Sequence, residues 1–260
     1  MSFDPAPAAA ELRRLRQERS VVMPLAPGMA PGTVAEGAAV QYALAGLAGA
    51  IPPAGFKIGA TGKRMQTYLG LDGPAAGFMA AADVYRHTAV LRFADIIKPG
   101  VECEVAVRLA RDLPPGPCTM DQAAAAVGEF VAGIEIVENR YDDLQTLGTP
   151  VLVADQVYHR AAVMGEQGAV DWRALDIGSL RGRILVDGVI RDEGVTSDLL
   201  GHPLNGLAWL ASSSVAAAFG GLKTGQVVML GSVTPPVWLD GPASVTVDFS
   251  PLPVVTVRLG

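Results

Sequence analysis

The pattern of hydrophobic and polar residues changes near residue 55. Before it, residues 9–20 have the spacing of a surface helix. Thr33-Val-Ala-Glu36 then has the spacing of a capping box ahead of an Ala-rich helix that runs to about Ala50. From Phe56 onward, short β-branched runs alternate with Gly and Pro, a pattern typical of strands. Strands are predicted at 55–59, 89–93, 102–109, 133–137, 161–164, 226–230, 244–249 and 253–259.

Three segments between these strands have clear local signals of their own. Thr119-Met-Asp-Gln122 is a second capping box, which predicts a helix to about Val131. Asp187-Gly188 suits a tight type I′ turn, so 183–191 is predicted to form a hairpin. An apolar face that follows a proline predicts a helix over 203–219. These elements together predict an α+β fold.

Composition limits the class of protein. The chain has 260 residues, half of them hydrophobic, which is enough for one sizeable core. We expect a helical N-terminal segment at 1–52 and one catalytic domain at 53–260. The net charge of -6, with scattered Lys and Arg, argues against nucleic acid as a partner. Two cysteines form no disulfide framework, which favours a reducing cytoplasm.

Neither export nor membrane insertion is predicted. The first sixteen residues carry five charged side chains and contain no apolar run of the signal-peptide type. The uncharged stretch 38–56 contains Gln41 and Pro52-Pro53 and is rich in small residues, so we interpret it as a buried helix that ends before the prolines. A cytoplasmic protein with no membrane partner is expected.

Three acidic residues on apolar segments are the strongest chemical signal. Glu102 and Glu104 are at positions i and i+2 of a predicted strand, so both point to one face while Cys103 points away. Glu135 lies on a second predicted strand. Buried carboxylates need a partner, and an all-oxygen ligand set favours Mg2+ or Mn2+ over zinc. The alternative is a solvent-facing row balanced by nearby arginines.

Five segments in order together carry a family resemblance. They are Gly55-Phe-Lys-Ile-Gly-Ala-Thr61, Val101-Glu-Cys-Glu-Val-Ala-Val-Arg-Leu109, Gly133-Ile-Glu-Ile-Val-Glu-Asn-Arg-Tyr141, Gly201-His-Pro-Leu-Asn-Gly-Leu-Ala-Trp-Leu210 and Leu222-Lys-Thr-Gly-Gln-Val-Val-Met-Leu-Gly-Ser232. The chain resembles the fumarylacetoacetate hydrolase superfamily from about Val22 to its C-terminus. Within the superfamily, it resembles the 2-oxopent-4-enoate hydratases and 4-oxalocrotonate decarboxylases of aromatic meta-cleavage pathways.

The resemblance implies a mixed β-roll in which Glu102, Glu104 and Glu135 hold Mg2+ or Mn2+. The ion would bind the carboxylate and 2-oxo oxygens of a small 2-oxo or 2-hydroxydienoic acid and stabilise an enolate. Lys57 matches a lysine that stands beside the substrate. A nearby cation would lower the pKa of Lys57, which makes it a candidate proton donor, whereas a strand lysine with no catalytic role is the alternative. A homo-oligomer is also implied, with a pathway aldolase or decarboxylase as a further expected partner.

The resemblance is weakest at 153–160, read as a strand segment. Relatives usually have Ala-Asp-Asn followed by small residues, where this chain has Asp155, Gln156, Tyr158 and His159. Asp155 is a catalytic candidate, or else an aspartate that holds backbone amides. Gln156 and His159 are candidate substrate contacts, His159 also as a proton shuttle, with a simple packing role for His159 as the alternative.

Two further sets of candidate residues lie elsewhere in the chain. Asp83 aligns with a catalytic aspartate of many hydratases only after a one-residue shift, and it is otherwise a turn residue. The backbone amides and hydroxyl of Gly231-Ser232 are expected to hold the substrate carboxylate.

Four functions compete. The leading hypothesis is a metal-dependent hydratase of 2-hydroxypenta-2,4-dienoate or a close analogue, giving 4-hydroxy-2-oxopentanoate. The second is a 4-oxalocrotonate decarboxylase, which needs a cation such as His159 or Arg160 for a second carboxylate. An acylpyruvate-type carbon–carbon hydrolase is disfavoured because 59–68 contains no histidine. A non-catalytic partner subunit is disfavoured because all three carboxylates are present.

Overall fold

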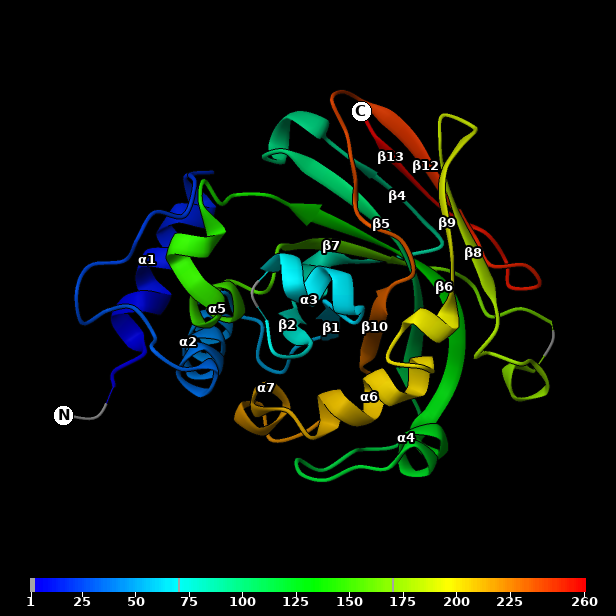
Figure 1. The fold of residues 1–260 in the computed structure, drawn as a ribbon, viewed down its shortest axis with the longest axis horizontal. Coiled ribbons are helices and arrows are strands. Elements are labelled where there is room, and N and C mark those ends of the chain that lie inside the picture. Colours follow the sequence, from blue (N-terminus) through cyan, green and yellow to red (C-terminus); the bar gives the residue numbers. More distant parts are fainter. Residues whose placement is uncertain (1–2, 70, 170) are drawn as a thin grey trace.

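The computed structural model describes residues 3–69, 71–169 and 171–260, without the side chains at 64, 68, 144 and 145. Two mixed sheets form the centre of these residues. Within these residues, an eight-stranded sheet faces a five-stranded one (Figure 1). The first has the order β2 (Ala75–Met79), β1 (Gly55–Gly59), β10 (Val227–Ser232), β5 (Pro99–Leu109), β6 (Val127–Glu138), β7 (His159–Met164) and β3 (Val84–Arg86), with β11 (Val237–Trp238) beside β5. The second has the order β4 (Thr88–Leu91), β13 (Val255–Leu259), β12 (Ala243–Asp248), β8 (Arg181–Val186) and β9 (Val189–Val195).

Side chains alternate along β5, so that one face of the strand packs against the second sheet and the other carries Glu102 and Glu104. Cys103 lies toward the second sheet, where its Sγ is 3.0 Å from the point that a Cβ on Gly182 would occupy. Strands β5 and β6 contact β8, β12 and β13 on this side. Because neighbouring residues of a strand point to opposite faces, Glu102 and Glu104 point away from the space between the sheets. The site therefore lies on the outer face of the larger sheet.

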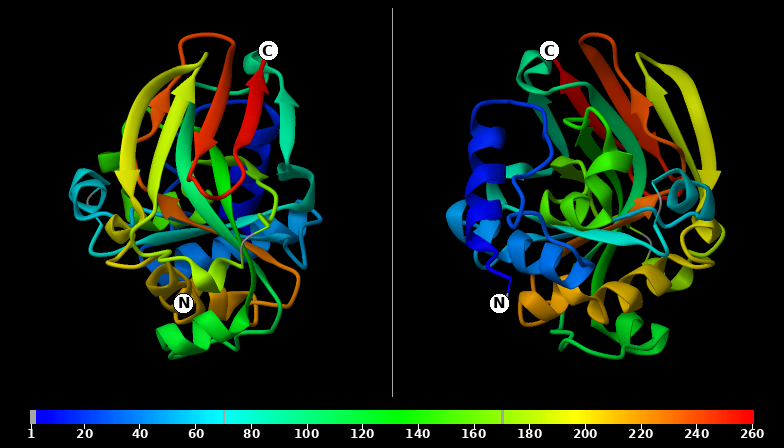
Figure 2. Two further views of the ribbon diagram at one scale, coloured as in Figure 1. Left: turned by 90° about the vertical axis from the view of Figure 1, so that its right-hand side faces the viewer. Right: turned by 60° about the vertical axis from the view of Figure 1, so that its left-hand side comes forward.

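Helices surround that outer face in two groups (Figures 1 and 2). One group contains α1 (Ala6–Gln17), α2 (Val34–Leu47) and α5 (Leu144–Ala154), which pack against one another through α2. The other contains α4 (Met120–Ala126), α6 (Pro203–Ala211) and α7 (Ser214–Ala218), with α6 packed on β10. Helix α3 (Lys63–Leu69) lies between them, and 3-10 turns occupy Ala81–Asp83, Phe93–Asp95, Trp172–Ala174 and Thr196–Asp198. No helix within the described ranges is long and apolar enough to cross a bilayer.

Several local predictions are confirmed. Both capping boxes form, at Thr33 with Glu36 and at Thr119 with Gln122. The hairpin turns at Asp187 and Gly188, which both have positive φ, 52° and 79°. The α+β class and the β-roll are confirmed as well. The division at 52/53 stays a prediction.

Three local predictions are wrong. The helix that starts after Thr119 ends at Ala126 rather than Val131, because residues from Val127 onward pair with β5. The helix expected over 203–219 is two helices, since the Ser213 hydroxyl caps a new start by accepting a hydrogen bond from the Ala216 amide. Residues 153–160 are not one strand: α5 ends at Ala154, a turn follows, and β7 begins at His159.

Candidate metal centre and active site

Three carboxylates meet on the outer face of the larger sheet. Glu102 on β5 lies directly opposite Glu135 on β6, and Glu104 follows two residues along the same face of β5. One oxygen from each of the three lies within 4.8 Å of the others. The cluster predicted from the sequence is therefore assembled by the register of one antiparallel strand pair.

A glycine on β6 makes room for the Met229 side chain beside this cluster. Gly133 lies opposite Glu104, and a Cβ at position 133 would come within 2.8 Å of the Met229 side chain. Because real Cβ atoms do not approach so closely, any other residue here would displace its neighbours. The Met229 side chain therefore occupies the space that a side chain at position 133 would need.

Glu104 and Glu135 are fully buried, and in each of them only one of the two carboxylate oxygens contacts a donor among the described residues. Glu104 Oε2 accepts a hydrogen bond from the Gly231 amide at 3.0 Å. Glu135 Oε1 lies 3.2 Å from Lys57 Nζ and 2.9 Å from His159 Nδ1. Glu104 Oε1 and Glu135 Oε2 are buried with no hydrogen-bond partner among the described residues. Unpaired buried oxygens are costly, and a hard divalent cation would satisfy both.

The electrostatics agree with a cluster built for a cation. Burial, and then repulsion by Glu135, raises the pKa of Glu102 to about 8. Burial, and then repulsion by Glu135 and Glu102, raises the pKa of Glu104 well above its ordinary value. Burial alone would raise the pKa of Glu135 too, but Lys57 and His159 outweigh it and lower that pKa. Burial and mutual repulsion oppose the ionisation of all three carboxyl groups at once, and a bound divalent cation would stabilise the ionised form.

Lys57 lies at the cluster, as the resemblance predicts. Its side chain is 2% exposed, and its strand β1 is joined to β5 through β10. Burial alone would lower the pKa of Lys57, but Glu135, Glu102 and Glu104 outweigh burial and raise it. The lowered pKa expected from the sequence assumed a bound cation. In the chain itself, Lys57 is an ammonium ion that faces three carboxylates.

His159 also lies at the cluster, through an irregularity between β6 and β7. Glu135 pairs with Ala162 and Ile136 with Ala161, but Val137 pairs with His159, which leaves Arg160 as an extra residue. Such a bulge shifts the alternation by one position, so His159 shares the face of Glu135. The ring is buried, and Nε2 has no hydrogen-bond partner among the described residues.

Gly231 and Ser232 have other partners than the substrate carboxylate expected from the sequence. The Gly231 amide donates to Glu104. The Ser232 hydroxyl accepts from the Cys103 and Thr234 amides and donates to the Cys103 carbonyl. The role of Gly231 and Ser232 as a cradle for the substrate carboxylate stays a prediction, and the bonds that the structure shows hold Glu104 and join β10 to β5.

Gln156 belongs to a turn rather than to a strand. Gln156, Val157 and Tyr158 all have positive φ, between 52° and 65°, which is rare for side-chain-bearing residues. The side-chain amide of Gln156 donates a hydrogen bond through Nε2 to the Phe78 carbonyl at 2.8 Å. Its assignment as a substrate contact stays a prediction, and the bond that the structure shows fixes the turn to β2.

The structure places the other two acidic candidates away from the cluster. Asp155 is buried between Arg16, Arg140 and Tyr141, with bonds of 2.8 Å from Arg16 Nε and 2.9 Å from the Tyr141 hydroxyl. Asp83, in the 3-10 turn, is partly exposed and lies 3.4 Å from an Arg160 nitrogen. The contacts of both are ion pairs of the framework, and their catalytic roles stay predictions.

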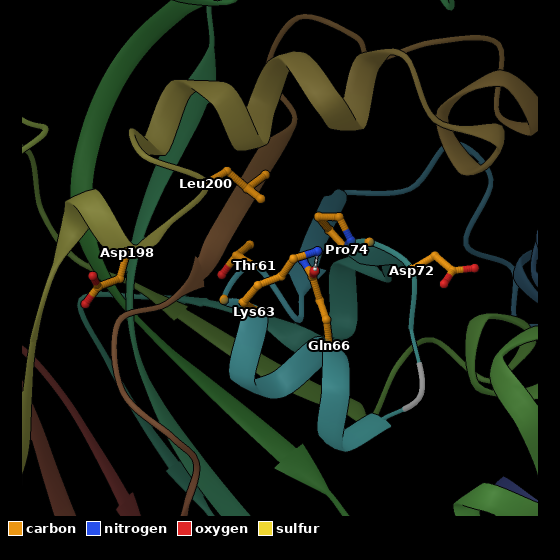
Figure 3. A pocket seen from close by; sticks show the side chains of 9 residues that line it. Thr61, Lys63, Gln66, Asp72, Pro74, Asp198 and Leu200 are labelled. Atoms are coloured by element: carbon orange, nitrogen blue, oxygen red, sulfur yellow. Dashed lines mark hydrogen bonds between the residues drawn. The ribbon is translucent and has the colours of Figure 1, made fainter.

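The structure also has a pocket that the sequence did not indicate, and its lining contains none of the three glutamates (Figure 3). Its volume is about 420 Å³, and its lining includes Thr61, Lys63, Gln66, Asp72 and Asp198. Its lining residue Thr61 lies beside Gly231, 2.6 Å from the point that a Cβ on Gly231 would occupy, and the Gly231 amide in turn binds Glu104. The lining residues come from two stretches of chain that are far apart in the sequence, 61–74 and 198–200, so no local pattern could identify the pocket. Thr61 is the one described lining residue that also belongs to a family motif, Gly55-Phe-Lys-Ile-Gly-Ala-Thr61.

A mixed β-roll with a buried carboxylate cluster and an adjacent ammonium provides a site that could hold a divalent cation. Residues 62–259 match the family described as fumarylacetoacetate (FAA) hydrolase C-terminal. The chain belongs to the fumarylacetoacetate hydrolase family.

The relatives narrow the branch of this family. The chain is 33% identical over 183 residues to a 2-keto-4-pentenoate hydratase of Burkholderia vietnamiensis, covering 70% of this chain and 68% of the relative. It is 30% identical over 231 residues to a 2-keto-4-pentenoate hydratase of Paraburkholderia phymatum, covering 87% and 86%. The 4-oxalocrotonate decarboxylase of Pseudomonas putida G7, solved with magnesium and adipate, superposes with a TM-score of 0.87 at 22% identity over 98% and 97%. The prediction of a hydro-lyase-type enzyme is confirmed.

Proposed function

We propose that the chain is a divalent-metal-dependent hydratase that converts 2-hydroxypenta-2,4-dienoate, or a close analogue, to 4-hydroxy-2-oxopentanoate. The observation that carries this proposal is a pair of buried oxygens beside the Lys57 ammonium, Glu104 Oε1 and Glu135 Oε2, which have no hydrogen-bond partner among the residues that the structure describes. Glu102, Glu104 and Glu135 would hold Mg2+ or Mn2+. The ion would supply Lewis acidity to the carboxylate and 2-oxo oxygens of the substrate.

Lys57 is the group that this chain offers for proton transfer. Its Nζ is held 3.2 Å from Glu135 Oε1 in a buried position, so its direction is fixed and water is largely excluded. Gly59 leaves room for it, since a Cβ at position 59 would lie 3.4 Å from Nζ. We assign Lys57 to proton donation at a substrate carbon and to orientation of the bound acid.

The charge of the pocket favours a substrate with one carboxylate. Asp72 and Asp198 line it, and Lys63 is the one cation among the described lining residues. Lys63 Nζ already donates to Gln66 Oε1 at 3.2 Å (Figure 3). A second carboxylate would meet a net negative lining there, whereas an uncharged vinyl group would not. This supports hydration of a monoacid dienoate, and the names of the two hydratase relatives agree with it.

Decarboxylation of 4-oxalocrotonate is the second candidate. It is favoured by the similarity in fold to the decarboxylase solved with adipate, a dicarboxylate. The cations named from the sequence for a second carboxylate are engaged elsewhere, His159 with Glu135 and Arg160 with Asp83. A homo-oligomer, an aldolase or decarboxylase partner and a cytoplasmic location stay predictions.

The test compares both substrates under the same conditions. Purified protein is mixed with freshly generated 2-hydroxypenta-2,4-dienoate, with Mn2+ or with chelator, and the dienol absorbance and product mass are followed. The proposal predicts a metal-dependent gain of one water, and a Lys57→Met variant that binds Mn2+ but turns over slowly. Release of carbon dioxide from 4-oxalocrotonate without hydration of the dienoate would replace the proposal with the decarboxylase.

A further inference from the structure

The carboxylate of Glu135 has a marked asymmetry between its two oxygens. Oε1 lies 2.9 Å from His159 Nδ1 and 3.2 Å from Lys57 Nζ, whereas Oε2 is buried and has no hydrogen-bond partner in the part of the chain that the structure describes. Two donors on one oxygen fix the rotation of the carboxylate. Oε2 is then the atom left to face a cation among Glu102, Glu104 and Glu135.

The histidine in this arrangement is a donor to Glu135 and lies outside the ligand set. A carboxylate accepts hydrogen bonds and cannot donate them, so Nδ1 must carry the hydrogen. The group of side chains whose ligand atoms lie within 4.8 Å of one another contains the three glutamates and does not include His159. His159 therefore contacts the site through Glu135.

The backbone has a specific feature that brings the ring to this position. The bulge at Arg160 moves His159 to the face of Glu135, because it shifts the side-chain alternation of β7 by one residue. The residue is also held by its own backbone, with the His159 amide donating to the Gln156 carbonyl at 3.1 Å and Arg16 donating to the His159 carbonyl. The ring is 1% exposed, so its orientation is set by packing and by the bond to Glu135.

We propose that His159 is a positioning residue for the metal centre, which acts by holding Glu135 Oε1 so that Oε2 is presented to the cation. The inference rests on the proposed function, since it assumes that the three glutamates bind the metal. Groups that orient metal ligands typically contribute roughly 10- to 100-fold to metal affinity. The substrate itself need not touch His159.

Two variants separate the hydrogen bond from the packing of the ring. His159→Leu fills the space but has no donor, and we expect Mn2+ to bind roughly 10- to 100-fold more weakly. His159→Asn can place an amide N–H close to the position of Nδ1, and we expect it to recover most of the lost affinity. The matched control is His87→Asn, because His87 is exposed and paired with Glu166 at the surface. That variant should bind Mn2+ like the unaltered chain.

The readouts are the Mn2+ dissociation constant from calorimetry and the electron paramagnetic resonance spectrum of the bound ion. Unfolding in chelator confirms that each variant is folded. Normal Mn2+ affinity and an unchanged spectrum in folded His159→Leu would overturn the inference and leave the proposed function standing. Equal losses in folded His159→Leu and His159→Asn would also overturn it, because the donor would then not be what matters. Failure of the unaltered chain to bind Mn2+ would overturn the metal site itself.

Discussion

At the scale of single residues, the site consists of acids that are costly to bury together. Glu104 and Glu135 are fully buried, and each has one oxygen bonded to a donor and one that finds no hydrogen-bond partner within the described ranges. The sequence indicated these residues because acidic side chains are rare on apolar strands. It could not indicate which oxygen each donor holds, since Gly231, Lys57 and His159 come from three other strands.

Proton binding by the empty cluster gives a pH-dependent prediction. The pKa of Glu102 is raised from 4.5 to about 8 in the folded chain, so the folded state holds a proton that the unfolded state loses between these values. The metal-free protein therefore loses stability as pH rises from about 4.5 to about 8. Metal binding requires the ionised carboxylates, so its stabilising effect should grow over the same range.

The measurement is the rise in melting temperature caused by saturating Mg2+, relative to chelator, at pH 5.5 and pH 8. We expect a larger rise at pH 8, in step with tighter Mg2+ binding. A rise of equal size at both pH values would show that the bound ion does not compete with protons at this cluster.

At the scale of elements, strand irregularities direct functional side chains. The bulge in β7 brings His159 to Glu135, and a second register shift lies between Met229 and Ser232 in β10. The second shift contains Gly231, whose amide holds Glu104. Regular alternation in the sequence predicts the strands but not where an extra residue is inserted, because that depends on the pairing partner. This is why the bond from the Gly231 amide to Glu104 could not be predicted from the sequence.

Gly231→Ala tests the β10 irregularity. Gly231 has φ of 111°, and a Cβ there would lie 2.6 Å from Thr61. We expect a loss of about 1–3 kcal/mol in unfolding free energy from backbone strain, with weaker Mn2+ binding because the amide of residue 231 moves away from Glu104. Chemical denaturation in chelator and Mn2+ calorimetry measure the two effects.

Gly225→Ala is the matched control for that change. Gly225 also has positive φ, 85°, but a Cβ there meets open space. We expect it to lose stability by about 1 kcal/mol and to keep its Mn2+ affinity. If Gly231→Ala behaved in the same way, the amide would have no part in the metal centre.

At the scale of the whole molecule, a buried ion network joins the N-terminal helices to the β-roll. Arg16 of α1 and Arg140, beyond β6, both bind Asp155, which also accepts from the Tyr141 hydroxyl. The sequence predicted the two N-terminal helices and most strands, since their patterns are local. It did not predict the network, because its members are up to 139 residues apart.

Asp155→Asn separates a framework role from the catalytic role expected from the sequence. The variant removes the carboxylate that Arg140, which is 3% exposed, binds most closely, and leaves Arg140 with the more distant carboxylate of Glu138 at 3.7 Å. Breaking a buried ion pair from one side costs about 3–5 kcal/mol, so unfolding free energy should fall by that amount while Mn2+ affinity of the folded protein stays the same. Chemical denaturation and calorimetry provide both values.

The control for this prediction is Asp248→Asn. Asp248 pairs with a half-exposed Arg183, and such surface pairs contribute about 0–1 kcal/mol. If Asp155→Asn abolished turnover with stability unchanged, Asp155 would be a catalytic residue rather than part of the framework.

The most direct measurement is anomalous X-ray scattering from crystals of the protein grown with Mn2+. We predict one strong peak among Glu102, Glu104 and Glu135, in contact with Glu104 Oε1 and Glu135 Oε2. The peak should be lost in Glu104→Gln crystals, in which the fold stays intact. A peak elsewhere in the molecule, or full occupancy in Glu104→Gln, would contradict the assignment of the metal centre on which the proposed hydratase depends.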